Sequence, residues 1–281
     1  MRNLKLTLTY EGSRFYGWQI QKNVRTVQGA LALAFADVMK EHPRIVAAGR
    51  TDRGVHAEGQ VVNVVLHGDP PSPRHVQSGR DIPLLRTPVS AADGDENPQL
   101  WSVEKIRREL NAALPADVTI LQAEFAPLNF HARHNARARV YRYQLVPEYS
   151  PFLRRHAWCV RRELKLAVLQ EAARCVVGKH NFRSFCDPDE EEDRSFKCTI
   201  DECDWREIKI TRPCFAKMVT FHIRADRFLW KMVRRLVGTM VEINAGRCSL
   251  EQFRSYFDTV SPQPAEWTAP PFGLFLERVI Y

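Results

Sequence analysis

The order of strand-like and helix-like segments most constrains the fold of this chain. The segments form two blocks of mixed strand order with few strand–helix–strand repeats. The first block, from about residue 3 to 67, reads as strand, loop, helix, strand, polar loop and strand. The second block starts near Ser102 and alternates helices with pairs of strands. This order predicts an α+β fold with a mixed, mostly antiparallel sheet.

The two blocks also predict the division of the chain. We expect an N-terminal α/β half over residues 1–101 and a C-terminal α/β half over residues 102–281. Residues 68–100 contain many prolines among Ser, Asp and Gly, a composition typical of a linker or insertion. Helices are expected after Thr26, a suitable N-cap, and over residues 227–245.

The run from Gly49 to Ala57 places one carboxylate, Asp52, in a polar turn between strand patterns at 45–48 and 60–66. No second acid, metal-ligand cluster or glycine-rich phosphate loop accompanies it, which argues against two-carboxylate hydrolysis, metal hydrolysis and P-loop chemistry. Two interpretations remain. Asp52 is either a lone catalytic aspartate or part of a structural turn with two solvated arginines.

Charge and composition narrow the class of partner and the compartment. The 281 residues carry a net charge of +8, which indicates a polyanionic partner, most simply nucleic acid. No window reaches the roughly 18 apolar residues of a membrane span. The N-terminus enters a strand at once, without a secretory signal. Seven cysteines in no dense framework favour a reducing, cytoplasmic location and no metal site.

Motifs at several places resemble the TruA family of tRNA pseudouridine synthases. The agreement begins with the run around Asp52, keeps its order along the sequence and covers nearly the whole chain, so it is far more specific than any single motif. The matching segments are 10–12 with 15–19, 49–57, 130–133 with 139–143, 228–238 and 269–274.

The resemblance implies a fold and an activity. The fold is the pseudouridine synthase fold, in which two ferredoxin-like halves join edge to edge into one long sheet with a central cleft. The activity is isomerisation of uridine to pseudouridine in tRNA, in the anticodon stem-loop around positions 38 to 40, after the base has been flipped out of its stack. Relatives act as homodimers. Because atoms and redox state balance in this reaction, no cofactor or metal is expected.

The resemblance also assigns roles to residues of this chain. Asp52 corresponds to the catalytic aspartate, Arg234 to an arginine that pairs with it, and Tyr141 to a tyrosine that stacks on the extruded uracil. From the residues alone, Arg234 could equally belong to a solvated basic stripe and Tyr141 could be an ordinary strand residue. Substrate or RNA binding is assigned to Arg50, Arg53, His56, Arg133, Arg139, Lys231 and Leu274. Within this set Arg50 would aid base extrusion, Leu274 would pack under the base, and Arg133 and Arg139 would follow phosphates.

Other interpretations stay open at this point. The same scaffold could serve an RNA-binding or RNA-folding protein without turnover, or a hydrolase that uses Asp52 with a second acid not visible in the sequence. The sequence does not choose whether Asp52 attacks the base, attacks the sugar or abstracts a sugar proton. It also does not name the uridines that are modified.

Overall fold

A computed structural model describes residues 1–67, 101–187, 195–210, 217–258 and 264–281. The proline-rich segment 68–100, the acidic segment after Asp187 and Cys214 lie outside the described residues. The statements below refer to the described part of the chain.

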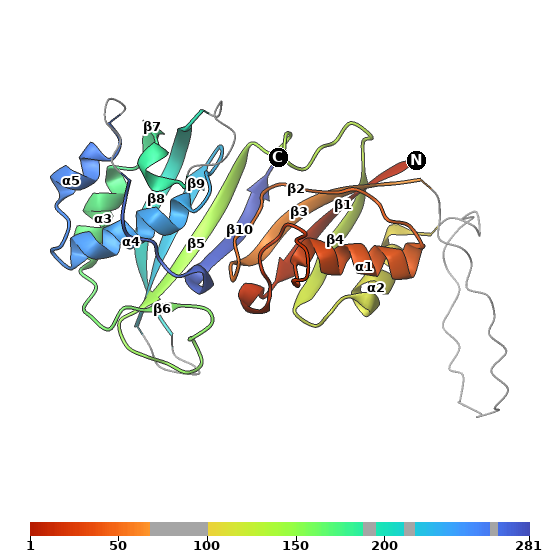
Figure 1. Cartoon of the computed structure of the whole chain (residues 1–281), viewed down its shortest axis with the longest axis horizontal. Helices are drawn as coiled ribbons and strands as arrows, with labels where there is room; N and C mark the ends of the chain where they lie inside the picture. The colour runs from red at the N-terminus through yellow and green to blue at the C-terminus, as the bar shows by residue number, and fades with distance from the viewer. Residues whose placement is uncertain (68–100, 188–194, 211–216, 259–263) are drawn as a thin grey trace.

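Ten strands form a single sheet (Figure 1), and its main path runs in the order β4-β1-β3-β10-β5-β9-β8-β7. The short strand β2 pairs with β3, and β6 pairs with β5. The strands are β1 (Arg2–Tyr10), β2 (Ile45–Ala47), β3 (His56–Leu66), β4 (Val118–Ala126), β5 (Ala138–Val146), β6 (Trp158–Cys159), β7 (Gly178–Asn181), β8 (Lys197–Lys209), β9 (Lys217–Ala225) and β10 (Leu274–Ile280).

The pairing is antiparallel except between β3 and β10 and between β5 and β6. This arrangement confirms the predicted α+β class with a mixed, mostly antiparallel sheet. The parallel contact of β3 with β10 has only two register pairs, Phe275 with His56 and Leu276 with Ala57. Strand β10 pairs over a longer register with β5 on its other side. A short parallel seam therefore joins the β4-β1-β3 group to the β5-β9-β8-β7 group.

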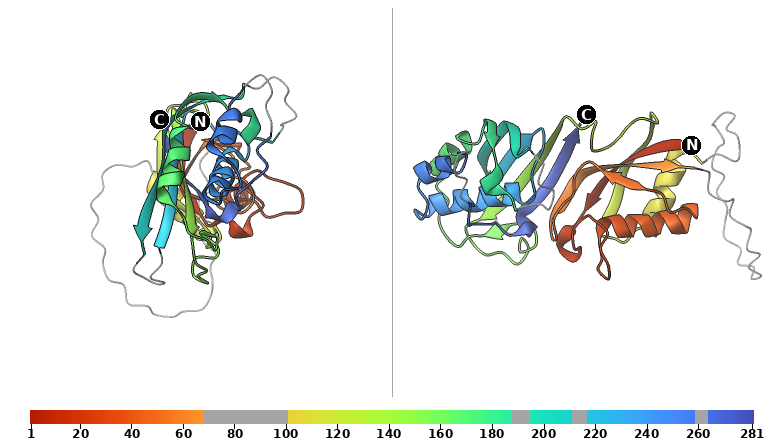
Figure 2. Two further views of the ribbon diagram at one scale, coloured as in Figure 1. Left: turned by 90° about the vertical axis from the view of Figure 1, so that its left-hand side faces the viewer. Right: turned by 45° about the horizontal axis from the view of Figure 1, so that its top comes forward.

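The helices pack on one face of this sheet, as Figure 2 shows from two further directions. Helices α1 and α2 accompany the β4-β1-β3 group, and α3 and α4 accompany the other group. The helices are α1 (Val27–Met39), α2 (Val103–Ala113), α3 (Leu166–Arg174), α4 (Met232–Asn244) and α5 (Leu250–Ser255), with 3-10 turns η1 (Gly12–Arg14), η2 (Arg183–Phe185) and η3 (Pro271–Gly273).

Side-chain hydroxyls start three of these helices. The Thr26 hydroxyl accepts a hydrogen bond from Gly29 N, which confirms the predicted N-cap of α1. Ser102 and Ser249 cap α2 and α5 in the same way. Each cap satisfies a backbone donor that has no partner within the helix.

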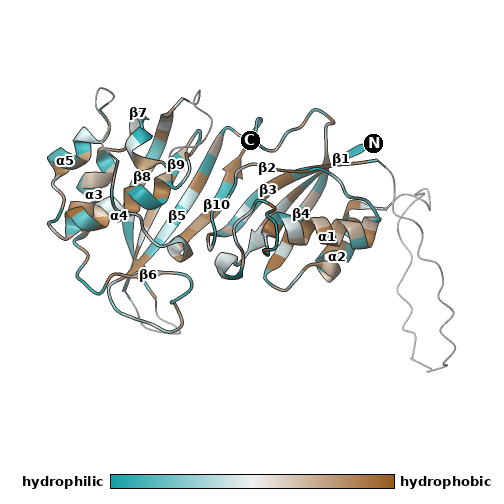
Figure 3. Ribbon diagram, viewed as in Figure 1, coloured by the Kyte–Doolittle hydropathy of each residue, from teal (hydrophilic) through white to brown (hydrophobic). Residues whose placement is uncertain are grey.

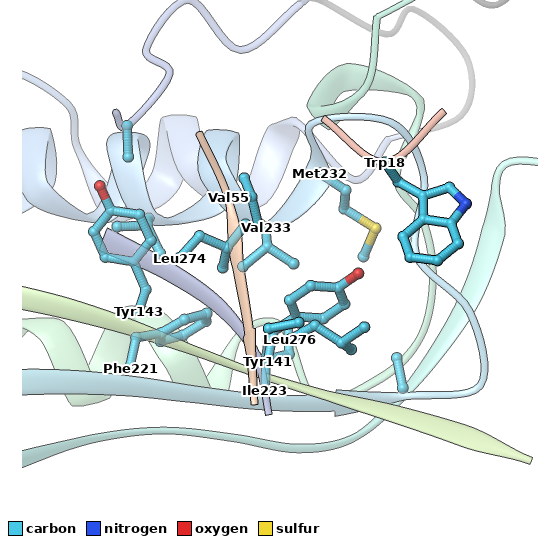
Figure 4. Close-up of a cluster of buried hydrophobic side chains, with 14 of the residues drawn as sticks. Trp18, Val55, Tyr141, Tyr143, Phe221, Ile223, Met232, Val233, Leu274 and Leu276 are labelled. Carbon is cyan, nitrogen blue, oxygen red and sulfur yellow. The ribbon is translucent and has the colours of Figure 1, made fainter. Parts of the chain in front are cut away.

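The main hydrophobic core lies between the sheet and the helices, and two small buried clusters lie apart from it. Apolar and polar residues alternate along much of β1 and β5 (Figure 3), so these strands send about every second side chain into the core, whereas nearly every residue of β3 is buried. Leu4, Leu6 and Leu8 of β1 are fully buried on this inner face. Figure 4 shows the part of the core where β5 and β10 meet α4, with Tyr143 beside Leu274. This part of the core lies beneath the site described next.

Helix α4 starts later than its sequence pattern predicts. The expected helix covered residues 227–245, but the helix begins at Met232. Lys231 has a φ of 61°, in the left-handed region, so the backbone cannot continue as an α-helix through it. Phe228, which lies before this turn, instead contacts the Tyr141 ring edge-on. The prediction was wrong here because the apolar residues before Met232 have the same three- and four-residue spacing as those of a helix.

Residues 103–126 pack with the first group of strands. Helix α2 contacts α1, and β4 pairs with β1 over most of its length. The division into halves at residues 1–101 and 102–281 stays a prediction. None of the described helices has the length and apolar character needed to cross a bilayer.

Candidate active site

Asp52 lies in the loop that leads from β2 into β3, and main-chain hydrogen bonds hold this loop against the segment after β1. Trp18 N donates to Thr51 O over 3.0 Å, and Gly54 N donates to Phe15 O over 3.2 Å. A Cβ atom on Gly17 would lie 2.8 Å from Thr51 O, and its φ is +90°. Only glycine therefore fits where the two segments approach each other.

Two buried polar side chains hold the same loop from the sheet. Gln60, which is 0% exposed, donates from Nε2 to Gly49 O over 2.8 Å. The Tyr10 hydroxyl lies 2.7 Å from Thr51 Oγ1, and burial raises the pKa of Tyr10 to about 12. These contacts fix the backbone on the N-terminal side of Asp52, so the carboxylate stands on a rigid support.

The partner of Asp52 comes from helix α4. Arg234 Nη1 donates to Asp52 Oδ2 over 3.1 Å, and the two side chains are 14% and 21% exposed. Arg234 Nε donates to Ala269 O over 2.8 Å, which orients the guanidinium. The ion pair occupies Oδ2, and Oδ1 has no hydrogen bond among the described residues. Asp52 is thus charge-paired and retains an oxygen for a substrate atom.

Tyr141 and Tyr143 point from β5 toward the helix side of the sheet. Tyr141 is 8% exposed and lies near Ile223, Leu276 and Met232 (Figure 4). Burial raises the pKa of Tyr141 well above its ordinary value, and nearby Asp52 acts in the same direction. The Tyr143 hydroxyl donates to Pro270 O over 2.7 Å. Among the described residues the Tyr141 hydroxyl has no such partner, so Tyr141 is the more accessible of the two for a ligand.

Three of the predicted RNA-binding arginines have exposed side chains: Arg50, Arg53 and Arg133. The Arg53 guanidinium lies 4.0 Å from the centre of the Tyr16 ring. Neither Arg50 nor Arg53 forms an ion pair with Asp52 in the described structure, although both flank it in the sequence. Proximity along the chain therefore did not identify the partner of the aspartate.

Other predicted RNA-binding residues already have partners inside the protein. His56 is 1% exposed, and Leu274 is 5% exposed in the core. Arg139 donates to four backbone carbonyls, those of Arg133, Ala136, Asp226 and Ala48, which links loops on both sides of β5. In this conformation His56 and Leu274 are not on the surface, and the Arg139 guanidinium is bound to the backbone.

Lys231 is also engaged. It forms an ion pair with Asp187, and Arg235 binds the other oxygen of the same carboxylate. These two cations lower the pKa of Asp187 although burial opposes the change. The three side chains fix the start of α4, one turn from Arg234.

The sequence pattern around the site did not identify its supporting residues. Tyr10, Gln60 and Trp18 were not assigned to the site, although they hold the Asp52 loop. A signal did exist for Gln60, since it is a polar residue at the start of an otherwise β-branched, buried strand. Trp18 is 2% exposed, so within the aromatic run 15–18 it belongs to the core, whereas Tyr16 is exposed.

One group of possible metal ligands occurs among the described residues: Glu11, His56 and His156 lie close together. The His56 ring has no lone pair left for an ion. Its Nδ1 accepts from Gly12 N, and its Nε2 faces the carbonyl oxygens of Arg155 and Phe272. The cluster is better described as a structural one.

Comparison with known proteins gives consistent matches over the whole chain. A family model described as tRNA pseudouridine synthase matches residues 7–135 and 172–281. These ranges contain Asp52, Arg234 and Leu274, whereas Tyr141 lies in the unmatched stretch between them.

Three curated relatives carry the name tRNA pseudouridine synthase A. The protein of Halalkalibacterium halodurans is 34% identical over 99% of this chain and 92% of its own length. That of Methylacidiphilum infernorum is 34% identical over 99% and 94%. That of Syntrophomonas wolfei is 35% identical over 100% and 98%.

Proposed function

This chain belongs to the tRNA pseudouridine synthase family, a family of isomerases, and we propose that it converts uridine to pseudouridine in the anticodon arm of tRNA with Asp52 as the catalytic residue. The observation that carries the proposal is the ion pair of 3.1 Å between Asp52 and Arg234. It joins the one acid of the predicted turn to a guanidinium 182 positions away in the chain. A structural turn alone would not need this partner.

We propose the following reaction for this site. The target base leaves its stack, at a cost of a few kcal/mol, and its ring lies against Tyr141. Asp52 then acts through its unpaired oxygen on the base, on the sugar carbon or on a sugar proton. The bond between N1 and the sugar carbon breaks, the ring turns, and C5 bonds to the same carbon. C5 loses its proton and N1 gains one, so atoms and electrons balance.

The assigned residues have separate roles in this proposal. Arg234 keeps a charge beside Asp52 and fixes its direction. Tyr141 supplies a flat apolar surface; its hydroxyl, whose pKa burial raises further above neutral pH, is protonated. The side chains of Arg50, Arg53 and Arg133 are exposed. Arg50 would aid base extrusion, and Arg53 and Arg133 would contact the RNA backbone. His56, Arg139 and Lys231 would not touch the RNA directly. They would support the RNA-binding surface through their hydrogen bonds and ion pair within the protein.

The test uses tRNA labelled with tritium at C5 of uridine, because isomerisation releases that hydrogen to water. Wild-type protein should release tritium and form pseudouridine, and Asp52→Asn should lose activity by roughly 10³-fold or more. The matched control is Glu124→Gln, which changes an exposed acid of the edge strand β4 that pairs with Lys5, and it should keep full activity. Equal product from wild type and Asp52→Asn would overturn the assignment. Free uracil or a cut strand would favour a hydrolase, and binding without any product would favour a non-catalytic RNA-binding protein.

Two further properties belong to the same proposal. We propose that the protein works in the cytoplasm, where its tRNA substrate occurs, and as a homodimer, as the family resemblance implies. Sedimentation of the purified chain at micromolar concentration checks the second point, and a monomer at that concentration would contradict it.

A further inference from the structure

A pocket next to the Asp52 loop has no part in the chemistry described so far. Its volume is about 270 Å³, and it starts at Arg53, the residue after Asp52. Both groups of strands contribute to it, since Ser13 and Gly54 line one side and Arg154 and Phe272 line the other. Arg155 and Pro271 complete the lining, so three arginines surround one small space.

A single buried imidazole holds the walls of this pocket. His56 Nε2 faces Arg155 O at 2.9 Å and Phe272 O at 3.1 Å, and both are acceptors, so Nε2 carries the proton. His56 Nδ1 accepts from Gly12 N over 3.0 Å, next to Ser13. The ring stacks on Phe275 with centroids 4.6 Å apart. His56 thus ties together three segments that are remote in sequence, and the pocket has a fixed shape.

Among the described residues, no ion pair compensates the charge of the pocket. Arg53, Arg154 and Arg155 are exposed, and in the described part of the chain no carboxylate pairs with any of them. The Glu11 carboxylate accepts from the hydroxyl of the lining residue Ser13 and lies 3.7 Å from His56 Nδ1. Three like charges around one space repel one another, and an anion between them would remove that repulsion.

We propose that this pocket binds one backbone phosphate of the RNA, next to the nucleotide that reaches Asp52. The inference rests on the proposed function. The planar guanidinium group of arginine matches the geometry of phosphate oxygens. The pocket is also next to the catalytic loop, because its lining residue Arg53 directly follows Asp52. A phosphate held there would set the register of the RNA without reading its bases. Arg154 and Arg155 lie outside the residues that the family model matches, whereas Arg53 lies within them.

The test combines a protein variant with chemically modified RNA. Synthetic anticodon stem-loops carry one neutral methylphosphonate in place of a single phosphate, at each linkage around the target uridine in turn. Turnover is measured for wild type, for the double variant Arg154→Gln with Arg155→Gln, and for a control double variant, Arg107→Gln with Arg108→Gln. The control removes the same charge from helix α2, which does not line the pocket.

With unmodified RNA, we expect the pocket variant to raise KM roughly tenfold or more and to leave kcat within about twofold. The control should stay within about twofold in both constants. At one linkage, the neutral group should raise KM for wild type by a similar factor and cause no further loss in the pocket variant. This coupling at one linkage is the result that identifies the bound phosphate.

Other outcomes overturn the proposal. The proposal is wrong if every neutral linkage raises KM by the same factor in wild type and in the pocket variant. It is also wrong if the control variant shows as large an increase in KM as the pocket variant.

Two measurements keep the result interpretable. Thermal unfolding checks that the double variant is folded. If the double variant is unfolded, the same measurements are made with Arg53→Gln in its place. Wild-type turnover on unmodified RNA tests the proposed function separately. If wild type shows no turnover, the same cycle is measured by equilibrium RNA binding. The proposed activity and the proposed phosphate site are then tested by separate measurements.

Discussion

The two sides of the candidate active site are held by different means. On the Asp52 side, hydrogen bonds from Tyr10, Gln60 and Trp18 fix the loop within a few residues of the acid. On the other side, Arg234 depends on the placement of a whole helix. A single charged hydrogen bond connects the two sides at the site, and the backbone seam nearby has only two register pairs. The comparison teaches that the acid is positioned locally, whereas its partner depends on packing at longer range.

Replacing Arg234 tests the connection itself, and we expect the largest effect here. Arg234→Gln should lower kcat by roughly 10²- to 10³-fold and the free energy of unfolding by about 2 kcal/mol, because Asp52 loses its charged partner. Steady-state kinetics and urea unfolding measure the two quantities. Arg235→Gln is the matched control, since Arg235 binds Asp187 and Ala265 O but not Asp52. An equal loss of kcat in the two variants would contradict the assigned role.

A change in helix packing should break the Arg234 side without touching a charged group. In Gly238→Ala, the new Cβ would lie 2.7 Å from Trp267 O, in the segment that also accepts from Arg234. We expect the free energy of unfolding to fall by roughly 1–3 kcal/mol and kcat to fall with it.

The matched glycine is Gly246, which has φ +75° and no atom near its Cβ position. Gly246→Ala should cost about 1–2 kcal/mol because of its left-handed backbone and leave kcat unchanged. Thermal unfolding and kinetics of both variants provide the check. A Gly238→Ala protein with wild-type kcat would show that α4 can shift without consequence.

A smaller loss of stability and activity is expected on the Asp52 side, because several hydrogen bonds hold the loop together and each contributes only part of its stability. Tyr10→Phe removes the 2.7 Å hydrogen bond to Thr51 and should cost about 1 kcal/mol of stability, with a several-fold loss of kcat. A double-mutant cycle with Thr51→Val isolates this contact. Additive effects in the cycle would mean that the hydrogen bond does not hold the loop.

The smallest predicted effect concerns pH at the seam. Burial lowers the pKa of His56, although the charge of Glu11 opposes the shift and His156 adds to it. The unfolded chain therefore binds a proton on this histidine at a higher pH than the folded protein does. Stability from His56 is fully present above about pH 6.5 and is lost as the pH falls toward the folded pKa, by at most about 1.4 kcal/mol per pH unit.

Urea unfolding between pH 7 and pH 5 measures this slope. His56→Gln should show a shallower slope than wild type, while His131 and His222, whose pKa values burial also lowers, contribute in both proteins. Parallel slopes would exclude His56 as the titrating group.

Local sequence signals predicted much of the fold. Thr26 starts α1 as expected, and the turn with Asp52 lies between two strands. The start of α4 was placed too early because Phe228 and Leu229 continue the helical spacing, and nothing in that spacing reveals the left-handed backbone at Lys231.

The site was less predictable because its contacts are long-range. His56 was assigned to RNA binding, but its partners are carbonyls 99 and 216 residues away. Such contacts leave no periodic pattern in the sequence. The pairing of Asp52 with Arg234 was predicted from the family resemblance. From the residues alone, Arg234 could equally have belonged to a solvent-exposed basic stripe on its helix.

The position of β10 has a consequence for how the protein is made. Leu274–Ile280 is the last strand in the chain order, yet it lies between β3 and β5 and joins the two groups. On the ribosome, both neighbours must wait with exposed backbone edges until this strand emerges, and such edges are prone to wrong pairing. A nascent chain halted just before Leu274 would already contain Asp52, Tyr141 and Arg234, but the sheet that brings them together would be incomplete.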